Sequence, residues 1–204
     1  MLSNYAELNE VHKDVLLELG NIGTGNAITA LSQLTNHPIK MELPSIRIVD
    51  FDGLPELMGK TEAEAAGVVI KVHCDLECIV TFILNENFTK VIAKELTYEE
   101  MTDVHTMSEM QQSAICEIGN IMCNAYLNAL ASMLEANLEV SVPVLKTGNC
   151  SRILKNFMND FENSGTEILF IENTFYYLNQ EVVSYILLHP KFESLTKILD
   201  QLSY

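Results

Sequence analysis

The chain has 204 residues and a mass of 22.9 kDa, the size of one large domain or two small ones. Its 12 basic and 28 acidic residues give a formal net charge of −16, which disfavours nucleic acid and anionic membrane surfaces and favours basic or locally neutral protein partners. With 48% hydrophobic and 20% charged residues, the composition is typical of a globular protein and excludes extensive disorder.

Two long helices, each followed by strands, are predicted along the chain. In the first half we expect a helix over residues 8–35, a strand over 39–49, a short helical or irregular stretch over 52–59, hairpin strands over 67–74 and 77–84, and a closing helix over 86–97. In the second half we expect the corresponding elements: a helix over 105–136, a strand over 138–147, a short helical or irregular stretch over 151–161, hairpin strands over 166–178 and 181–189, and a closing helix over 190–202. The apolar residues at helical spacing in the first long helix are Val11, Val15, Ile22, Leu31 and Leu34. The methionines Met101, Met107 and Met110 are interpreted as packing residues.

The two halves are copies of each other. A shift of 99 residues aligns the segment beginning at Asp14 with the segment beginning at Ser113 without gaps. The identical pairs include Glu18 with Glu117, Gly20 with Gly119, Asn21 with Asn120, Ile22 with Ile121, and Pro44 with Pro143. The sequence therefore predicts a tandem duplication, with repeats over about residues 1–100 and 101–204.

The repeat leads to a specific fold class. We expect an α+β fold, a two-layer α/β arrangement of two α-β-(α)-β-β-α units related by a pseudo-two-fold axis. Each unit would hold a three-stranded sheet and a long helix, and together they would form one domain over residues 1–204. Three strands with one helical face are marginally stable alone, so pairing the halves would bury the remaining apolar surface.

A polar stripe is predicted on each long helix. Asp14, Glu18 and Asn21 are spaced four and three residues apart, which places them on one helix face. The second copy has Ser113, Glu117 and Asn120. A single copy is most simply a solvated stripe. However, Glu and Asn are identical in both copies while exposed neighbours differ, and Asn is a poor residue for a helix interior. These two observations favour a functional site.

Glutamate and asparagine cannot complete a phosphate site alone. No histidine lies beside them for a catalytic triad, and the second long helix has no Lys or Arg to neutralise the charge of phosphoryl transfer. The pair can complete a site whose metal and lysine belong to a partner. Asn21 would then orient water for in-line attack, and Glu18 would pair with the partner's lysine. Gly20 and Gly119 are interpreted as sites of close helix packing, the alternative being a bend that clears space beside the asparagine.

The N-terminus and the cysteines indicate a cytoplasmic protein. The first ten residues contain no basic segment followed by an apolar one, and no apolar run is long enough to span a membrane. The five cysteines are odd in number and scattered, as expected for free thiols. His73, Cys74 and Cys78 lack a second pair of ligands at zinc-like spacing, so we expect ordinary thiols there. Cys116 and Cys123 are interpreted as core residues.

The pattern Asp/Ser-x3-Glu-x2-Asn-x22-Pro occurs from Asp14 to Pro44 and from Ser113 to Pro143, and it resembles the signature of the CheC phosphatases of bacterial chemotaxis. The resemblance covers nearly the whole chain. It implies an enzyme that hydrolyses the aspartyl phosphate of the response regulator CheY, which would itself supply Mg²⁺ and a lysine. This chain would bind no metal or other cofactor. The resemblance implies that Glu18 and Glu117 pair with that lysine and that Asn21 and Asn120 orient the attacking water. It also implies that Asp14 and Ser113 contact the partner.

The resemblance also implies a second partner, the receptor deamidase CheD, which stimulates the family's activity. Its contact would lie near the short helix of the second half, about residues 150–162. The chain is expected to act as a monomer. The alternatives are a non-enzymatic adaptor that sequesters CheD in response to phosphorylated CheY, and a structural component of a flagellar switch. Because Met122–Cys123–Asn124 replaces Gly23–Thr24–Gly25 in the second copy, bulk at these positions is a possible source of inequality between the two sites.

Overall fold

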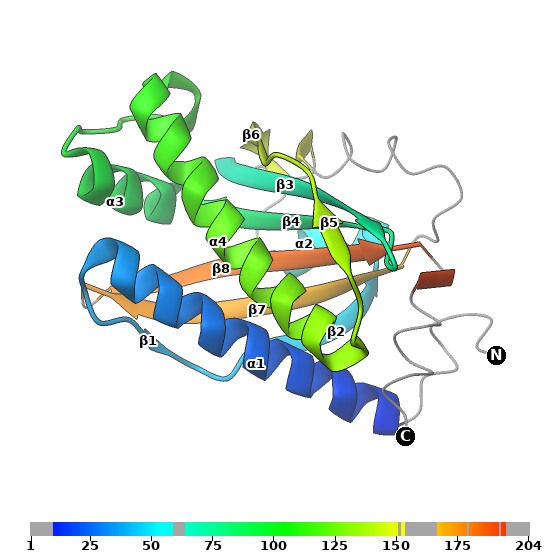
Figure 1. Ribbon diagram of the computed structural model, residues 1–204. Helices are drawn as coiled ribbons and strands as arrows, with labels where there is room; N and C mark the ends of the chain where they lie inside the picture. Colours follow the sequence, from blue (N-terminus) through cyan, green and yellow to red (C-terminus); the bar gives the residue numbers. More distant parts are fainter. Residues whose placement is uncertain are drawn as a thin grey trace.

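Two long helices lie next to each other across one face of an antiparallel sheet (Figure 1). The computed structural model describes residues 10–58, 64–150, 152–153, 167–178, 180–191 and 193–194. Helix α1 spans Glu10–Thr35 and helix α4 spans Glu109–Leu134, close to the predicted ranges. Helix α4 begins where Ser108 and Gln111 form a capping box, in which each side chain accepts a hydrogen bond from the other residue's backbone N–H.

Within the described residues, eight strands form one sheet. Their bounds are β1 Lys40–Met41, β2 Ser45–Asp50, β3 Glu64–Cys74, β4 Cys78–Asn85, β5 Leu138–Val140, β6 Val144–Asn149, β7 Glu167–Tyr177 and β8 Gln180–Pro190. The predicted strands over 39–49 and 138–147 are each divided in two, with Pro44 and Pro143 in the gaps. Proline explains the interruption because it has no N–H to donate to a neighbouring strand.

The sheet has an internal symmetry that confirms the pseudo-two-fold repeat. Its order is β1-β7-β8-β4-β3-β5, with β2 also pairing with β7 and β6 also pairing with β3. Exchanging the first-half strands for their second-half counterparts reverses this order, so the symmetry axis lies between the central strands β4 and β8. The α+β class is therefore confirmed.

The halves do not keep the separate three-stranded sheets predicted for them. Strand β2 leaves its own half and pairs with β7, from Ser45 opposite Glu172 to Asp50 opposite Glu167. Strand β6 makes the reciprocal pairing with β3, from Val144 opposite Val69 to Asn149 opposite Glu64. The physical reason is that each hairpin has one edge on the central pair and offers its other edge to the incoming strand, which satisfies backbone groups that would otherwise be unpaired.

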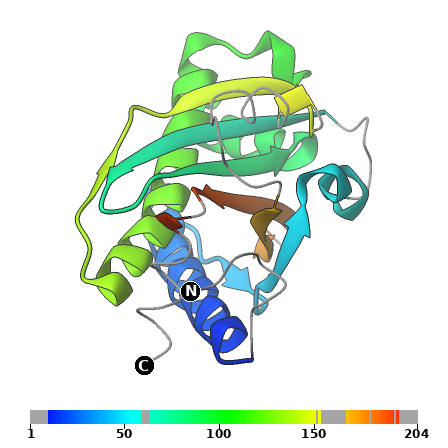
Figure 2. The same cartoon turned by 90° about the vertical axis from the view of Figure 1, so that its right-hand side faces the viewer.

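The remaining helices cover the two faces of the sheet. Helix α3 spans Glu86–Thr97, as predicted, and contacts α4. The 3₁₀ turns η2, Phe51–Gly53, and η3, Val104–Thr106, precede α2 and α4, and α2 spans Leu54–Leu57. Figure 2 shows α2 and α4 on opposite sides of the sheet. The predicted stretches 151–161 and 190–202 fall mostly outside the described residues.

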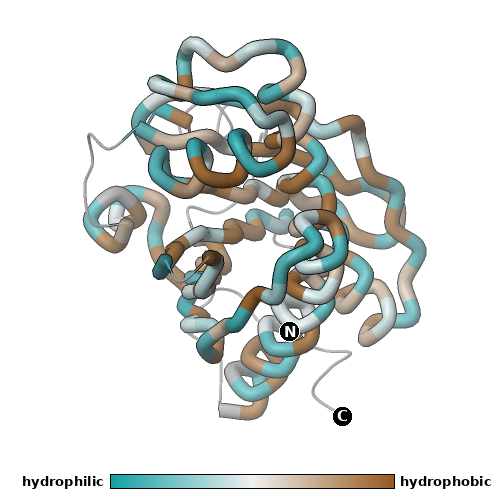
Figure 3. Tube along the Cα trace, turned by 90° about the vertical axis from the view of Figure 1, so that its left-hand side faces the viewer, coloured by the Kyte–Doolittle hydropathy of each residue, from teal (hydrophilic) through white to brown (hydrophobic). Residues whose placement is uncertain are grey.

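Hydrophobic residues form a core on each side of the sheet. On the helix side, α1 contributes Leu16, Leu19, Ala27 and Leu31, and α4 contributes mainly Ile115, Ile118, Met122, Tyr126 and Leu130. A smaller cluster on the other side includes Leu54, Ile153, Phe170 and Leu187. Figure 3 shows the alternation of hydrophilic and hydrophobic residues along the chain that produces these two-sided elements. Among the described residues, no helix is long and apolar enough to cross a membrane.

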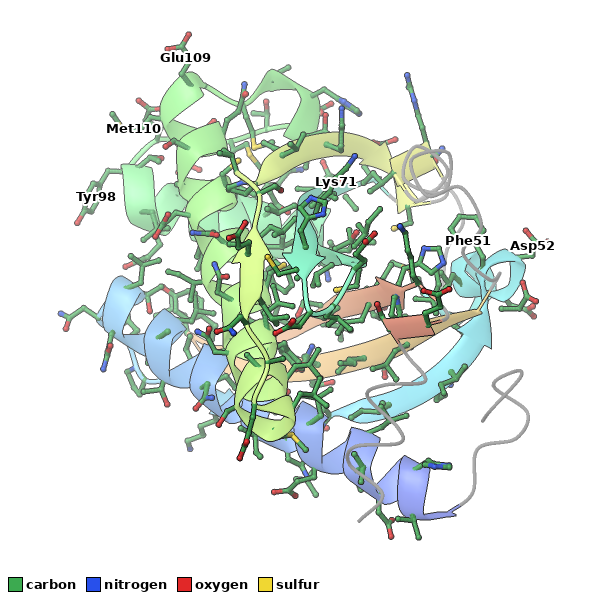
Figure 4. The ribbon with its side chains drawn as sticks, turned by 45° about the vertical axis from the view of Figure 1, so that its right-hand side comes forward. Phe51, Asp52, Lys71, Tyr98, Glu109 and Met110 are labelled. Atoms are coloured by element: carbon green, nitrogen blue, oxygen red, sulfur yellow. The ribbon has the colours of Figure 1, made fainter. Side chains whose placement is uncertain are left out.

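Several apolar residues expected at packing positions are exposed. Val11, Ile22 and Leu34 lie on the outside of α1, because the core side of this helix is the Leu16–Leu19 stripe. Met101 and Met107 are buried, as predicted, whereas Met110 is exposed. Figure 4 shows Glu109 and Met110 at the start of α4, on the same end of the molecule as Tyr98 and opposite to Phe51 and Asp52. The packing interpretation of Met110 was therefore wrong.

Candidate functional site

The structure places each predicted triple on one face of its helix. On α1, Asp14 and Glu18 are exposed and Asn21 is half-buried. On α4 the same gradient recurs, with Ser113 and Glu117 exposed and Asn120 half-buried. Each carboxylate is therefore accessible to a partner, while each carboxamide lies where the helix meets the rest of the fold.

Glycine brings each motif helix very close to the sheet just before its asparagine. A Cβ atom on Gly20 would lie 2.0 Å from Cδ1 of Ile46 in β2 and 3.7 Å from Cγ of Pro44. A Cβ atom on Gly119 would lie 2.3 Å from Cβ of Val68 in β3. These contacts support the close-packing interpretation of both glycines. The contact of Gly20 also places the segment around Pro44 beside the first site.

Exposed apolar side chains accompany both motifs. Leu43 is 83% exposed and Val142 is 81% exposed, and the two occupy equivalent positions of the repeat, each directly before a motif proline. On α1, Val11 and Ile22 are exposed on the helix face that carries Glu18, and on α4 Met110 is exposed at the position equivalent to Val11. Sequence reasoning did not single out these exposed residues. The available signal was a large apolar residue before proline in both copies, in the gaps between β1 and β2 and between β5 and β6.

The two asparagines have different surroundings. The Oδ1 atom of Asn21 is buried and has no hydrogen-bond partner among the described residues. The Oδ1 atom of Asn120 accepts a hydrogen bond of 2.8 Å from Nδ2 of Asn124. In the first copy Gly25 stands at the position of Asn124, and it has no side chain to offer.

The difference between the surroundings of the two asparagines does not come from the bulk considered above. Met122 and Cys123 are fully buried and point into the core. Their counterparts Gly23 and Thr24 leave room for Tyr126 of α4, whose ring would contact a Cβ atom on Gly23 at 2.5 Å. Of Met122, Cys123 and Asn124, only Asn124 is hydrogen-bonded to Asn120.

A buried polar cluster joins the two motif helices to the sheet. The hydroxyl of Tyr126 on α4 donates to Oδ1 of Asn173 in β7 at 2.7 Å, and Oγ1 of Thr24 on α1 donates to the same atom at 3.0 Å. The Tyr126 and Thr24 hydroxyls also contact each other, and because each carries a single hydrogen, a hydrogen bond between them replaces one of the two bonds to Asn173. Burial raises the pKa of Tyr126, so its hydroxyl remains protonated and available as a donor. The cluster holds α1 and α4 in a fixed relation to the strands between the two sites.

The surroundings of the cysteines near the sites disfavour their thiolate forms. Cys123 is buried, as predicted, but Cys116, next to Glu117, is only half-buried. Burial raises the pKa of both thiols. At the β3–β4 hairpin, Cys74 is exposed and free, and burial raises the pKa of Cys78 to about 12. Within the part of the chain that the structure describes, no three His, Cys, Asp or Glu side chains gather as a metal site.

Comparison with known proteins matches both copies of the motif. The model of the CheC-like family matches residues 11–47 and again residues 110–146, ranges that contain the predicted site residues of each copy and its motif proline. The CheY-P phosphatase CheC of Bacillus subtilis (strain 168) is 26% identical over 201 residues, which cover 97% of this chain and 96% of that protein.

Solved structures show the same fold. The X-ray structure of Thermotoga maritima FliY superposes with a TM-score of 0.74 at 19% identity, covering 97% of this chain and 98% of that one. A complex of CheX, CheY, BeF₃ and Mg²⁺ from Borrelia burgdorferi contains a similar chain, with a TM-score of 0.53 at 13% identity and coverage of 88% and 97%.

Proposed function

Because this chain belongs to the CheC-like family, we propose that it is a phosphatase that hydrolyses the aspartyl phosphate of the response regulator CheY. The observation that carries this proposal is the doubled arrangement of an exposed glutamate and a half-buried asparagine on the outer faces of α1 and α4. A site on the outside of a helix suits a substrate that brings its own pocket, as a phosphorylated protein does. The names of the relatives support the same activity, because the B. subtilis protein is a CheY-P phosphatase and the B. burgdorferi CheX is seen in complex with CheY.

The proposed mechanism divides the chemistry between the two proteins. CheY supplies the phosphoryl group, Mg²⁺ and a lysine, and this chain binds no cofactor of its own. Glu18 or Glu117 pairs with that lysine and fixes the helix in the regulator's active site. Asn21 or Asn120 orients a water molecule, whose oxygen attacks phosphorus as the bond to the aspartyl oxygen breaks, so that aspartate and inorganic phosphate are released. Asp14 and Ser113, one turn earlier, contact the regulator's surface.

The absence of cations from α4 fits this division of roles. This helix contains no Lys or Arg, so Glu117 has no basic partner on its own helix and is available to a lysine from outside. Transfer of a phosphoryl group requires positive charge near the departing oxygens. With a formal net charge of −16, this chain is poorly suited to supply that charge, and the regulator's metal and lysine would do so.

The exposed apolar residues before the motif prolines are expected to contribute affinity. A chain with Leu43→Ser and Val142→Ser should show a KM for phosphorylated CheY raised about fivefold and an unchanged kcat. The reason is that each substitution removes roughly 1 kcal/mol of apolar contact with CheY at its site. Leu178→Ser is the matched control, since Leu178 is an exposed leucine outside both motif segments. Steady-state phosphate release would measure both constants, and a fall in kcat at constant KM would contradict a role in docking.

The proposed activity is tested with purified protein and phosphorylated CheY. We expect the chain to accelerate phosphate release from CheY in the presence of Mg²⁺ but to leave acetyl phosphate in solution untouched. A CheY variant whose active-site lysine is changed to alanine should lose most of the acceleration, because the glutamates then have no partner. Failure to accelerate release from wild-type CheY, or equal hydrolysis of acetyl phosphate, would refute the proposal.

We also propose that the chain acts as a cytoplasmic monomer and that it binds CheD. The stretch assigned to CheD, about residues 150–162, lies mostly outside the described residues. The adaptor alternative differs in one measurable respect, since an adaptor would bind CheD and phosphorylated CheY without shortening the lifetime of the phosphoryl group. The phosphate-release experiment therefore separates the two.

A further inference from the structure

We infer that Asn124 is a positioning residue of the second site, which holds the carboxamide of Asn120 in one orientation, and that the first site works without such support because Gly25 replaces it. The inference rests on the proposed function, since it concerns the residue that would orient the attacking water. It extends that function by ranking the two sites and by assigning the difference to one side chain.

The geometry of the second site supports this role. Asn124 follows Asn120 by one helical turn, so the two side chains share a helix face. Nδ2 of Asn124 donates to Oδ1 of Asn120 at 2.8 Å, and both residues are half-buried, so water competes poorly for this hydrogen bond. A carboxamide oxygen accepts two hydrogen bonds. One lone pair therefore remains on Asn120 for the attacking water, while the bond to Asn124 fixes where that lone pair points.

The first site lacks this arrangement. Gly25 has no side chain, and the Oδ1 atom of Asn21 is buried without a partner among the residues described. In this orientation the oxygen faces the protein rather than a water molecule at the surface. Asn21 must therefore reorient before it can act through its oxygen, whereas Asn120 is already held.

Helix stability does not explain Asn124. Asparagine is a weaker helix former than most residues, and position 124 lies in the middle of α4. Replacement by leucine, which has the same branching at Cγ but no donor and is a better helix former, should leave the fold at least as stable. A loss of activity in that variant would then come from the missing hydrogen bond.

The experiment isolates each site in the full chain and compares paired substitutions. The second site is studied alone in a chain with Glu18→Ala and Asn21→Ala. There, Asn124→Leu should lower kcat for phosphorylated CheY about fivefold with KM unchanged, because only the orientation of the water-binding group is lost. Asn124→Gln, which keeps an amide donor, should recover part of kcat. An unchanged kcat in Asn124→Leu would overturn the inference.

The first site provides the reciprocal test. In a chain with Glu117→Ala and Asn120→Ala, Gly25→Asn should raise kcat about threefold. The substitution fits because a Cβ atom on Gly25 would meet no atom within 4 Å apart from its chain neighbours and the nearby backbone of its own helix. Gly25→Ala is the control, since it adds a Cβ atom and gains at least as much helix propensity as asparagine but has no amide. Equal kcat values for Gly25→Asn and Gly25→Ala would contradict the assignment.

A spectroscopic measurement without CheY separates this inference from the proposed function. Three-bond couplings that report the χ1 angle of Asn120 should indicate a single rotamer in the wild-type chain and averaging between rotamers in Asn124→Leu. If Asn120 is already averaged in the wild-type chain, the inference fails. If the wild-type chain shows the single rotamer but no phosphatase activity, the proposed function fails and the positioning contact stands.

Discussion

A chain with Glu18→Ala, Asn21→Ala, Glu117→Ala and Asn120→Ala should leave phosphorylated CheY to decay at its own rate. We expect the acceleration of phosphate release to fall by at least about 100-fold, because the water is no longer oriented and neither helix can pair with the regulator's lysine. Loss of radiolabelled phosphate from CheY, measured with and without each variant, gives the effect directly. Full activity in the quadruple variant would exclude the mechanism.

Two controls make that result specific. The two double variants, each removing one site, should both retain activity, with more remaining when Glu117 and Asn120 are intact. Stability should not confuse the comparison, because the glutamates are exposed and alanine is a better helix former than asparagine. Asn21→Ala also removes a buried acceptor that has no partner among the described residues. The urea midpoint of the quadruple variant should therefore be no lower than that of the wild type.

Gly119→Ala should destabilise the whole fold by about 3 kcal/mol. The added methyl would lie 2.3 Å from Cβ of Val68 and 2.5 Å from both of its Cγ atoms. Val68 is fully buried in β3, which is paired on both sides, so it has no space into which to move. Helix α4 would have to move away from the sheet, which would also displace Glu117 and Asn120. Chemical denaturation followed by circular dichroism measures the loss.

The matched control is the same substitution at Gly25. Gly25→Ala adds a methyl group at an exposed helix position that, its chain neighbours and nearby helix backbone aside, has no atom within 4 Å, and it should increase the free energy of unfolding by about 1 kcal/mol. The effect of Gly20→Ala on the free energy of unfolding should lie between those of Gly119→Ala and Gly25→Ala. The clash at Gly20 is with the Cδ1 tip of Ile46, which can rotate. Similar losses at Gly119 and Gly25 would show that backbone freedom, rather than close packing, decides the effect.

Most secondary structure could be predicted because the duplication presents each element twice. The predicted helix over 86–97 matches α3, since Asn85 caps its N-terminus and Tyr98 ends it in the left-handed conformation. The hairpin β3–β4 was predicted from the two apolar segments on either side of the turn at Asp75 and Leu76. The placement of Glu18 and Asn21 on one helix face followed from helical periodicity alone.

The remaining features depend on contacts that local patterns do not encode. The pairing of β2 with β7 joins segments far apart in the sequence, and each strand has the same residue pattern whichever hairpin it joins. The exposure of Val11 and Met110 depends on which side of each helix faces the sheet. The hydrogen bond between Asn124 and Asn120 depends on side-chain rotamers, although the four-residue spacing of the two asparagines was a visible signal.

The exchange of β2 and β6 between the halves makes this chain a covalently linked dimer of repeats. Separate repeats would have to find each other in solution to pair these strands, at a cost that depends on protein concentration, whereas the linked chain pays only for closing a loop. Strand β2 also has to wait for β7, which is synthesised after most of the chain. The strand beside Gly20 is therefore set in place only when the second repeat is complete, so a ribosome-bound first repeat would still lack a finished site.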